Sequence, residues 1–301
     1  MRVLELMPFD QVDDPICTEA LIAEQLSRVP PSRFPELIYA KLPLAWLVNT
    51  NGVAAVQQIL FQLFEKVPPS RLVFVCQHIQ VKQLDFRGAT VFTPHAEVSD
   101  PYVAIPHHAV QADGLGPSSP IPMAERSYLA SFRGAFWTHP CREALAKHLQ
   151  GDAFLIQDTG AWHFQHDAST QAASARDYKR LLSESVFTLC PRGTGPSSVR
   201  LWEAFAFGSI PVVVADSAEL PLSDILDWDS FALRVRESEL STLADRLGAV
   251  SPAELARMQE VGQAAYQTWF HKERLSSVII EELTHRHEST RLEHHPSEPQ
   301  V

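Results

Sequence analysis

The chain has 301 residues, of which 45 % are hydrophobic, enough apolar material for two domains of ordinary size or one large domain. Its formal net charge of −11 argues against a general nucleic-acid binder, because such proteins need a basic surface to neutralise phosphates. The same charge leaves room for one local basic pocket that holds a small anion.

The four cysteines form no CxxC pair, which argues against zinc-ribbon and thioredoxin-like sites, and we expect buried, reduced thiols. The first residues carry neither a basic start nor a signal-peptide cleavage site. No apolar run is long enough to span a bilayer. We therefore expect a cytoplasmic protein without a transmembrane segment.

Strand-like and helix-like patterns alternate in the first part of the chain. The predicted strands are Arg2–Met7, Leu44–Val48, Leu72–Cys76 and Ala89–Thr93. The predicted helices are Pro15–Ser27 and Val53–Lys66. This alternation predicts a parallel sheet with helices on its faces.

The alternation stops between Asp100 and Arg126, where many prolines predict a linker or an extended crossing. It then resumes, with predicted strands at Ser127–Phe132, Ala153–Ile156, Val186–Leu189 and Ile210–Val214. The predicted helices are Cys141–Leu149, Ala175–Glu184 and a helix from Ser198 to the C-cap residue Gly208. A last helical segment, Pro252–Thr284, is expected to pack across both halves.

These patterns predict an α/β protein with two parallel-sheet domains. The expected boundaries are residues 1–105 for the first domain, 106–126 for a linker, 127–284 for the second domain with its closing helix, and 285–301 for a disordered, His-rich tail. Two such domains suggest a cleft, and ligands of parallel sheets bind outside the carboxyl ends of the strands.

The loop CPRGTGPSS follows a predicted strand and leads into a helix. Gly193 and Gly195 would let the backbone approach a ligand, and Ser197 or Ser198 would cap the helix, whose first turn favours an anion. Arg192 adds a forked cation that suits phosphate oxygens. The loop matches neither the Walker nor the GxGxxG pattern, but it predicts a cradle for a diphosphate.

Arg200 and Glu203 are three positions apart and share one face of the predicted helix. A carboxylate at this depth accepts two ribose hydroxyls while the helix start holds the phosphates. The alternative is a surface ion pair between Arg200 and Glu203 on an ordinary α/β loop. The residues alone leave both interpretations open.

The stretch CPRGTGPSSVRLWEAFAFGSIPVVVAD, residues 190–216, resembles the signature of the exostosin family of glycosyltransferases. That signature combines a CPRG loop, a Ser/Thr-rich turn, an Arg–aromatic–Glu–Ala helix and a GxIPV strand. Asp100–Pro106, Tyr128–Leu145 and Glu219–Val235 resemble further segments of the family, whereas the likeness is faint before Asp100.

The resemblance implies a GT-B fold, in which two Rossmann-like domains face each other across a cleft. It implies an acceptor-side first domain, a second domain that binds a nucleotide-sugar, and transfer with inversion and without a metal or other cofactor. We expect a UDP-sugar donor, a glycan acceptor and a role in polysaccharide synthesis. Eukaryotic exostosins are Golgi membrane proteins, so this chain, with its short first domain and no anchor, resembles a compact microbial relative.

The residues expected at the donor site share this loop and the glycine turn near residue 134. They are Arg133, Arg192, Gly193, Ser197, Ser198, Arg200 and Glu203. By position in the family signature, Arg192 would hold the diphosphate and stabilise its departure, and Glu203 would hold the ribose.

An inverting transferase commonly needs a base that takes the proton of the acceptor hydroxyl. Loops at strand ends of the first domain offer His78, His95, Asp10, Asp13 and Asp14. Of these we favour His78 or one of the aspartates, such as Asp13.

A possible metal site and two other classes of function are weighed against this interpretation. His163 and His166, beside Asp167, are spaced for one helical face, but without a clear third ligand we expect no metal site. The alternative function is a non-catalytic nucleotide- or glycan-binding module that kept the fold, and a missing base would favour it. A scaffold that binds no nucleotide is the third class.

Overall fold

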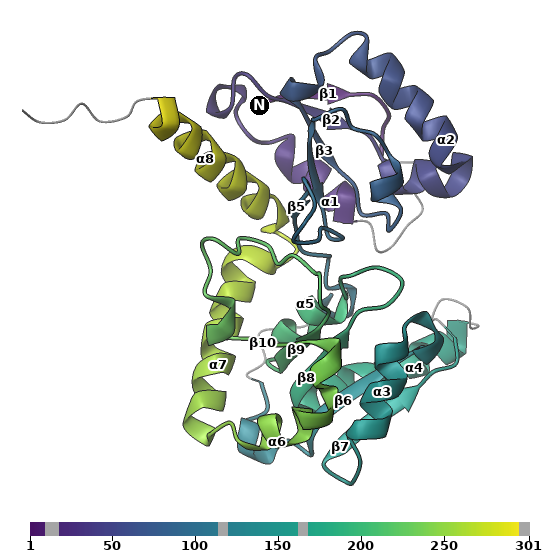
Figure 1. The fold of residues 1–301 in the computed structure, drawn as a ribbon, viewed down its shortest axis with the longest axis vertical. Helices are drawn as coiled ribbons and strands as arrows, with labels where there is room; N and C mark the ends of the chain where they lie inside the picture. The colour runs from purple at the N-terminus through teal and green to yellow at the C-terminus, as the bar shows by residue number, and fades with distance from the viewer. Residues whose placement is uncertain (10–17, 114–119, 162–167, 295–301) are drawn as a thin grey trace, which may run out of the picture.

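The computed structural model describes residues 1–9, 18–113, 120–161 and 168–294. These residues form two α/β halves, each built on a sheet of five parallel strands (Figure 1). Among the described residues, no helix combines the length and the apolar character that a membrane crossing requires.

The first half holds a sheet with the strand order β1-β2-β3-β4-β5. Its strands are β1 (Arg2–Glu5), β2 (Ile38–Lys41), β3 (Leu72–Val75), β4 (Thr90–Thr93) and β5 (Val103–Ala104). Its helices are α1 (Thr18–Leu26) and α2 (Leu44–Phe64). Every residue of the central strand β3 is buried, because helices cover a parallel sheet on both faces.

The predicted strand Leu44–Val48 is wrong, because these residues form the first turns of α2. Leu44, Leu47 and Val48 are spaced at helical intervals and are buried on one face of the helix. Gly52, with a φ of 80°, interrupts the helix just after them and divides its apolar pattern into two short pieces. The strand of this region is β2, which the sequence reading missed.

The second half holds a sheet with the strand order β10-β9-β8-β6-β7. Its strands are β6 (Tyr128–Gly134), β7 (Phe154–Asp158), β8 (Ser185–Pro191), β9 (Ile210–Val214) and β10 (Leu233–Val235). Its helices are α3 (Pro140–His148), α4 (Ala168–Glu184), α5 (Arg200–Ala206), α6 (Leu243–Gly248) and α7 (Pro252–Ala265). The predicted end of α5 near Gly208 is confirmed, although the C-cap residue itself is Phe207 and Gly208 follows it with a φ of 68°.

The strand order reverses between β6 and β8. β7 follows β6 on one side, and the chain then crosses to β8 on the other side before it continues outward to β9 and β10. In open parallel sheets such a switch point leaves a crevice at the carboxyl ends of the two strands, where ligands bind. The loops after β6 and β8 are therefore the expected walls of a site.

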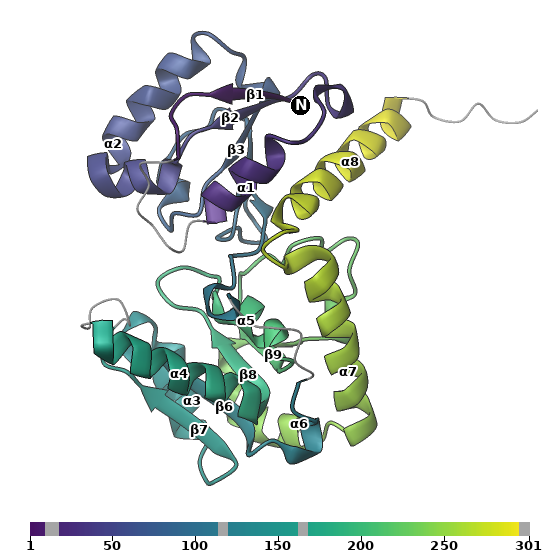
Figure 2. The ribbon, with the colours of Figure 1, turned by 180° about the vertical axis from the view of Figure 1, so that it is seen from behind.

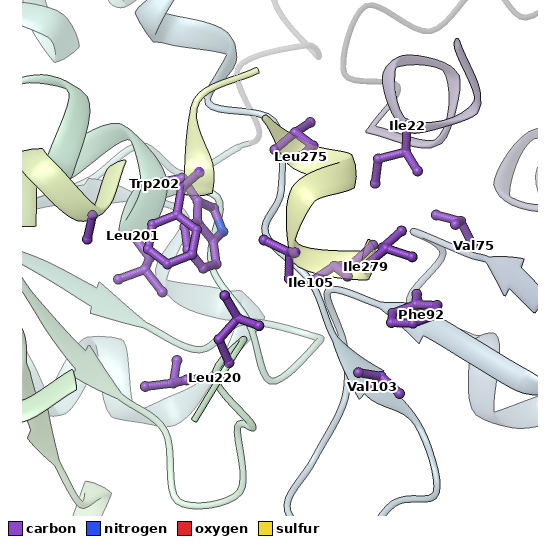
Figure 3. Close-up of a cluster of buried hydrophobic side chains, with 14 of the residues drawn as sticks. Ile22, Val75, Phe92, Val103, Ile105, Leu201, Trp202, Leu220, Leu275 and Ile279 are labelled. Carbon is purple, nitrogen blue, oxygen red and sulfur yellow. The ribbon is translucent and has the colours of Figure 1, made fainter. Parts of the chain in front are cut away.

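The last helix, α8 (Leu275–His294), returns to the first half, where it contacts α1 (Figures 1 and 2). Figure 3 shows Leu275 and Ile279 of α8 between Ile22 of the first half and Trp202 of the second, in one continuous apolar cluster. The expected packing of the C-terminal segment across both halves is confirmed. The disordered tail predicted from His285 is wrong as far as His294, because these residues continue α8.

Candidate functional site

A cavity of about 470 Å³ lies between the two halves. The first half contributes Ile79, His95 and His107, which follow β3, β4 and β5. The second half contributes the loops after β6, β7 and β8, together with residues of α3, α4 and α5. The two sheets therefore face each other across a cleft, which is the GT-B arrangement that the resemblance implies.

Arginine side chains gather on the second-half wall of the cavity. Arg133 ends β6, Arg142 lies in α3 and Arg200 begins α5, and all three line the cavity. Arg200 donates to the carbonyl of Arg133 at 2.7 Å and stacks over the ring of Phe132 at 4.6 Å. This wall is the local basic pocket that the sequence permitted in an acidic protein.

Two of these guanidinium groups keep an N–H without a partner. The Nε atoms of Arg133 and Arg200 are buried and have no hydrogen-bond partner. The ion pair of Arg133 with Asp177 is long, at 3.8 Å, and the aspartate side chain is 59 % exposed. A buried donor without an acceptor costs about 1–3 kcal/mol, so oxygens of an anionic ligand fit this wall.

Arg142 holds the loops of the switch point together, and the sequence analysis missed it. Its guanidinium donates to the carbonyls of Ala135 at 2.8 Å, Arg192 at 2.9 Å and Pro191 at 3.3 Å. Burial, with a smaller contribution from the neighbouring Arg200, lowers the pKa of Arg142 to about 10, so the group stays charged at neutral pH. The Arg-bearing helix of the resembled segment Tyr128–Leu145 is the signal that could have found it.

Glu203 is the only carboxylate among the described residues that line the cavity. It is 5 % exposed, and its two oxygens accept from the hydroxyl of Tyr178 at 2.7 Å and from the backbone N–H of Gln111 at 3.3 Å. Burial, and then the charge of Glu203, raise the pKa of Tyr178 well above its ordinary value, which keeps that hydroxyl a donor. Within the described residues no ion pair joins Glu203 to Arg200, so the surface-pair alternative is not what forms.

Arg192 does not line the cavity with the other three arginines. It is absent from the described residues that line the cavity, and its backbone bonds Val214 and Arg142. Its Nε is buried without a partner. The predicted contact of Arg192 with a diphosphate stays a prediction, and the charge at the wall comes instead from Arg133, Arg142 and Arg200.

The glycines of the loop make room for side chains of the protein. A Cβ on Gly193 would meet Nη2 of Arg142 at 2.8 Å, and a Cβ on Gly195 would meet Nδ1 of His95 at 2.7 Å. Both contacts are closer than real Cβ atoms tolerate. The glycines thus let an arginine and a histidine approach the loop, which differs from the expected role of bringing backbone to a ligand.

Ser197 and Ser198 line the cavity but do not cap the helix. α5 begins at Arg200 after Val199, and no side chain caps its first turn, so the predicted cap is wrong. Ser198 accepts from Arg200 at 3.4 Å. Ser197 is instead hydrogen-bonded to two histidines of the first half, His95 at 3.1 Å and His107 at 3.0 Å.

His78, one of the favoured bases of the sequence analysis, lies outside the cavity. His78 is not among the residues that line the cavity, and its two ring nitrogens bond Asn49 at 3.0 Å and the N–H of Gln80 at 3.1 Å. Asp13 lies outside the described residues. Asp10, Asp14, His163, His166 and Asp167 lie outside them as well.

One group within the described ranges has atoms that could meet on a metal. It consists of His139, Cys141 and Glu237, whose ligand atoms all lie within 4.8 Å of one another. The Nδ1 atom of His139, however, already accepts the backbone N–H of Cys141 at 3.3 Å as the cap of α3. A metal at that nitrogen would displace the cap, and the absence of a metal site stays a prediction.

Comparisons with known proteins match this chain to exostosin-type proteins and to proteins named as glycosyltransferases. The profile of the exostosin GT47 domain matches residues 61–250, more than half of the chain. A relative from Oryza sativa subsp. japonica, named "Probable glucuronosyltransferase GUT1", is 30 % identical over 169 residues, which are 55 % of this chain and 39 % of the relative. The "Exostosin-1 homolog" of Caenorhabditis elegans is 29 % identical over 157 residues, 48 % of this chain and 41 % of the relative.

The chain thus spans about two fifths of the length of the curated relatives that it matches. Among solved structures, WaaG, described as a glycosyltransferase involved in lipopolysaccharide biosynthesis, shares 13 % identity. The match covers 94 % of this chain and 98 % of WaaG, with a TM-score of 0.42.

Proposed function

The chain belongs to the exostosin GT47 family, and from this premise we propose that it is a glycosyltransferase that binds a nucleotide-sugar in the cavity between its halves. The observation that carries the proposal is the wall formed by Arg133, Arg142 and Arg200, in which buried N–H groups lack acceptors. A diphosphate supplies oxygens and negative charge to such donors.

Glu203 supports a nucleoside next to this diphosphate. Each of its carboxylate oxygens accepts one hydrogen bond and has capacity for another, so a ribose with two vicinal hydroxyls suits it. We propose UDP as the nucleotide and, since several relatives carry the name glucuronosyltransferase, UDP-glucuronic acid as the first donor to test.

In the proposed reaction an acceptor hydroxyl of a glycan attacks the anomeric carbon while the bond to the diphosphate breaks. Direct displacement inverts that carbon. The negative charge of the leaving diphosphate grows towards the transition state, where a preorganised arginine wall stabilises it more than it stabilises the bound donor. We propose that these arginines replace a metal ion in this role. A part in polysaccharide synthesis belongs to the same proposal, and the cytoplasmic location stays a prediction.

The experiment is a thermal-unfolding screen of the protein with UDP, GDP, UDP-glucuronic acid and UDP-glucose in the presence of a chelator. UDP at about a hundred times its dissociation constant should add about 2.7 kcal/mol to the free energy of unfolding. If all four ligands leave the transition unmoved, the donor site is wrongly assigned. UDP binding without release of UDP from any donor would favour the non-catalytic module instead.

A further inference from the structure

A serine of the second half links two histidines of the first half inside the cavity. Oγ of Ser197 lies 3.1 Å from Nδ1 of His95 and 3.0 Å from Nε2 of His107. The other nitrogen of His95, Nε2, lies 3.1 Å from the backbone carbonyl of Gln77. Both histidines are at least nine-tenths buried, with exposed fractions of 5 % and 7 %.

The direction of each hydrogen bond in this series, from Gln77 through His95 and Ser197 to His107, follows from the carbonyl of Gln77. A carbonyl only accepts, so Nε2 of His95 carries the proton and donates to Gln77. In the neutral ring Nδ1 of His95 is then an acceptor, and the Ser197 hydroxyl donates to it. The Ser197 oxygen in turn accepts from Nε2–H of His107. The assignment, made from the hydrogen-bond pattern, leaves Nδ1 of His107 as an unprotonated nitrogen.

Elimination points to the same atom. Both ring nitrogens of His78 and of His95 are bonded, and the remaining acceptor capacity of Glu203 is assigned to the ribose of the donor. Among the described residues, Nδ1 of His107 has no hydrogen-bond partner, and His107 lines the cavity. It is therefore the one imidazole nitrogen of the described wall that is free to accept a proton.

We propose that His107 is the general base of the reaction, held in its reactive tautomer by Ser197 and His95; this rests on the proposed function. The acceptor oxygen forms its bond to the anomeric carbon and gives its proton to Nδ1 of His107. The bond between the anomeric carbon and the phosphate oxygen breaks, and its electron pair leaves with the diphosphate. Ser197 and His95 are positioning residues in this scheme.

The electrostatic surroundings decide when this ring takes a proton. Burial, and then the neighbouring His95, lower the pKa of His107 well below 6.5, so the ring is neutral and able to accept at neutral pH. His95 is itself buried, and Lys82 opposes its protonation. Two charged side chains of α5, Arg200 and Glu203, also line the cavity. A bound diphosphate adds negative charge to the same cavity, which favours the imidazolium as the donor breaks.

The first experiment reads the tautomer directly, without any enzyme assay. Long-range ¹H–¹⁵N spectra of the ¹⁵N-histidine-labelled protein should show His107 protonated at Nε2 and bare at Nδ1, with the signals assigned by the variant His107→Gln. In Ser197→Ala the preference for this tautomer should weaken. A His107 ring that carries its proton at Nδ1 overturns the proposal.

The second experiment separates the base from the donor site. Gln at position 107 keeps an N–H for Ser197 but has no basic nitrogen, so His107→Gln should lower the turnover of UDP-glucuronic acid about 10²- to 10⁴-fold. The readout is UDP release, with water or an added oligosaccharide as acceptor. The dissociation constant of UDP should change less than about threefold, since base catalysis acts on the acceptor side.

Control and rival variants complete the test. His148→Gln, an exposed histidine at the end of α3, should leave turnover unchanged. If His78→Gln or Asp13→Asn loses turnover while His107→Gln keeps it, His107 is not the base. If the wild-type protein binds UDP but releases none from any donor, the proposed function fails, and the role of His107 fails with it.

Discussion

Ser197 and His95 are 102 positions apart in the chain and share a hydrogen bond of 3.1 Å across the cleft. The serine follows β8 of the second half, and the histidine follows β4 of the first. The bond places the two loops in direct contact at the cavity. A change in either loop should therefore affect both the stability of the protein and ligand binding.

Gly195→Ala should destabilise the protein. Its Cβ would lie 2.7 Å from Nδ1 of His95, the nitrogen that accepts from Ser197, so the ring must shift and the hydrogen bond is lost. Overpacking of this kind typically costs about 1–3 kcal/mol. Urea unfolding measures it, with Gly248→Ala as control, because nothing lies within 4 Å of a Cβ there. Equal stability of the two variants contradicts the close packing.

Arg133→Ala should weaken UDP more than Arg192→Ala. Arg133 lines the cavity with an unbonded Nε, whereas Arg192 does not line it. A hydrogen bond to a charged group is worth about 1.5–3 kcal/mol, or about 10- to 150-fold in the dissociation constant. Isothermal titration with UDP gives the comparison, with the exposed Arg246→Ala as reference. The reverse order of losses would restore Arg192 to the diphosphate, as the sequence signature implied.

Glu203→Gln should weaken UDP by about 1.5–3 kcal/mol and inorganic diphosphate by much less, because the carboxylate is proposed to touch only the ribose. The amide oxygen still accepts from Gln111, and the amide nitrogen can donate to Tyr178, so the fold should tolerate the change. Glu260→Gln, an exposed position on α7, is the matched control. A similar loss for both ligands would show that Glu203 acts through the shape of the pocket.

Acid should destabilise the protein through His95. Burial lowers its pKa in the folded protein to about 4, below the ordinary 6.5 of the unfolded chain. As the pH falls below 6.5, the His95 side chain binds a proton in the unfolded state, whereas in the folded state it stays neutral down to about pH 4. The free energy of unfolding therefore falls across that window, by about 3 kcal/mol for this group. Urea unfolding of the wild type and of His95→Gln should converge or cross as the pH falls, and a constant difference would exclude the effect.

The sequence predicted most of the second half because local patterns and tertiary burial agree there. The strand Ile210–Val214 is confirmed residue for residue, since both sheet faces bury this apolar run. The first half was harder. Pro43 and the positive φ of Gly52 hide the start of α2, and β2 is a strand of only four residues whose partners come from distant segments.

The sequence likewise predicted some residues of the candidate site and missed others. Arg133, Ser197, Ser198, Arg200 and Glu203 all line the cavity, because motif position fixes which residues follow a strand end. The direction of a side chain depends on contacts that no local pattern contains. Arg192 follows β8 directly yet does not line the cavity, while His107 enters it from a segment that reads as a linker.

The path of α8 has a mechanical consequence. The polypeptide passes from the first half to the second before β6 and returns between α7 and α8, where α8 is anchored in an apolar cluster that contains residues of both halves. Two connections restrict the relative motion of the two halves mainly to a rotation about the line that joins the connections. The mouth of the cavity should thus widen and narrow along one path, so that Ser197 meets His95 and His107 in the same register at each closure. Cutting the backbone between His271 and Leu275 would leave a single connection. The two halves should then no longer bring Ser197 back to His95 and His107 in a fixed orientation.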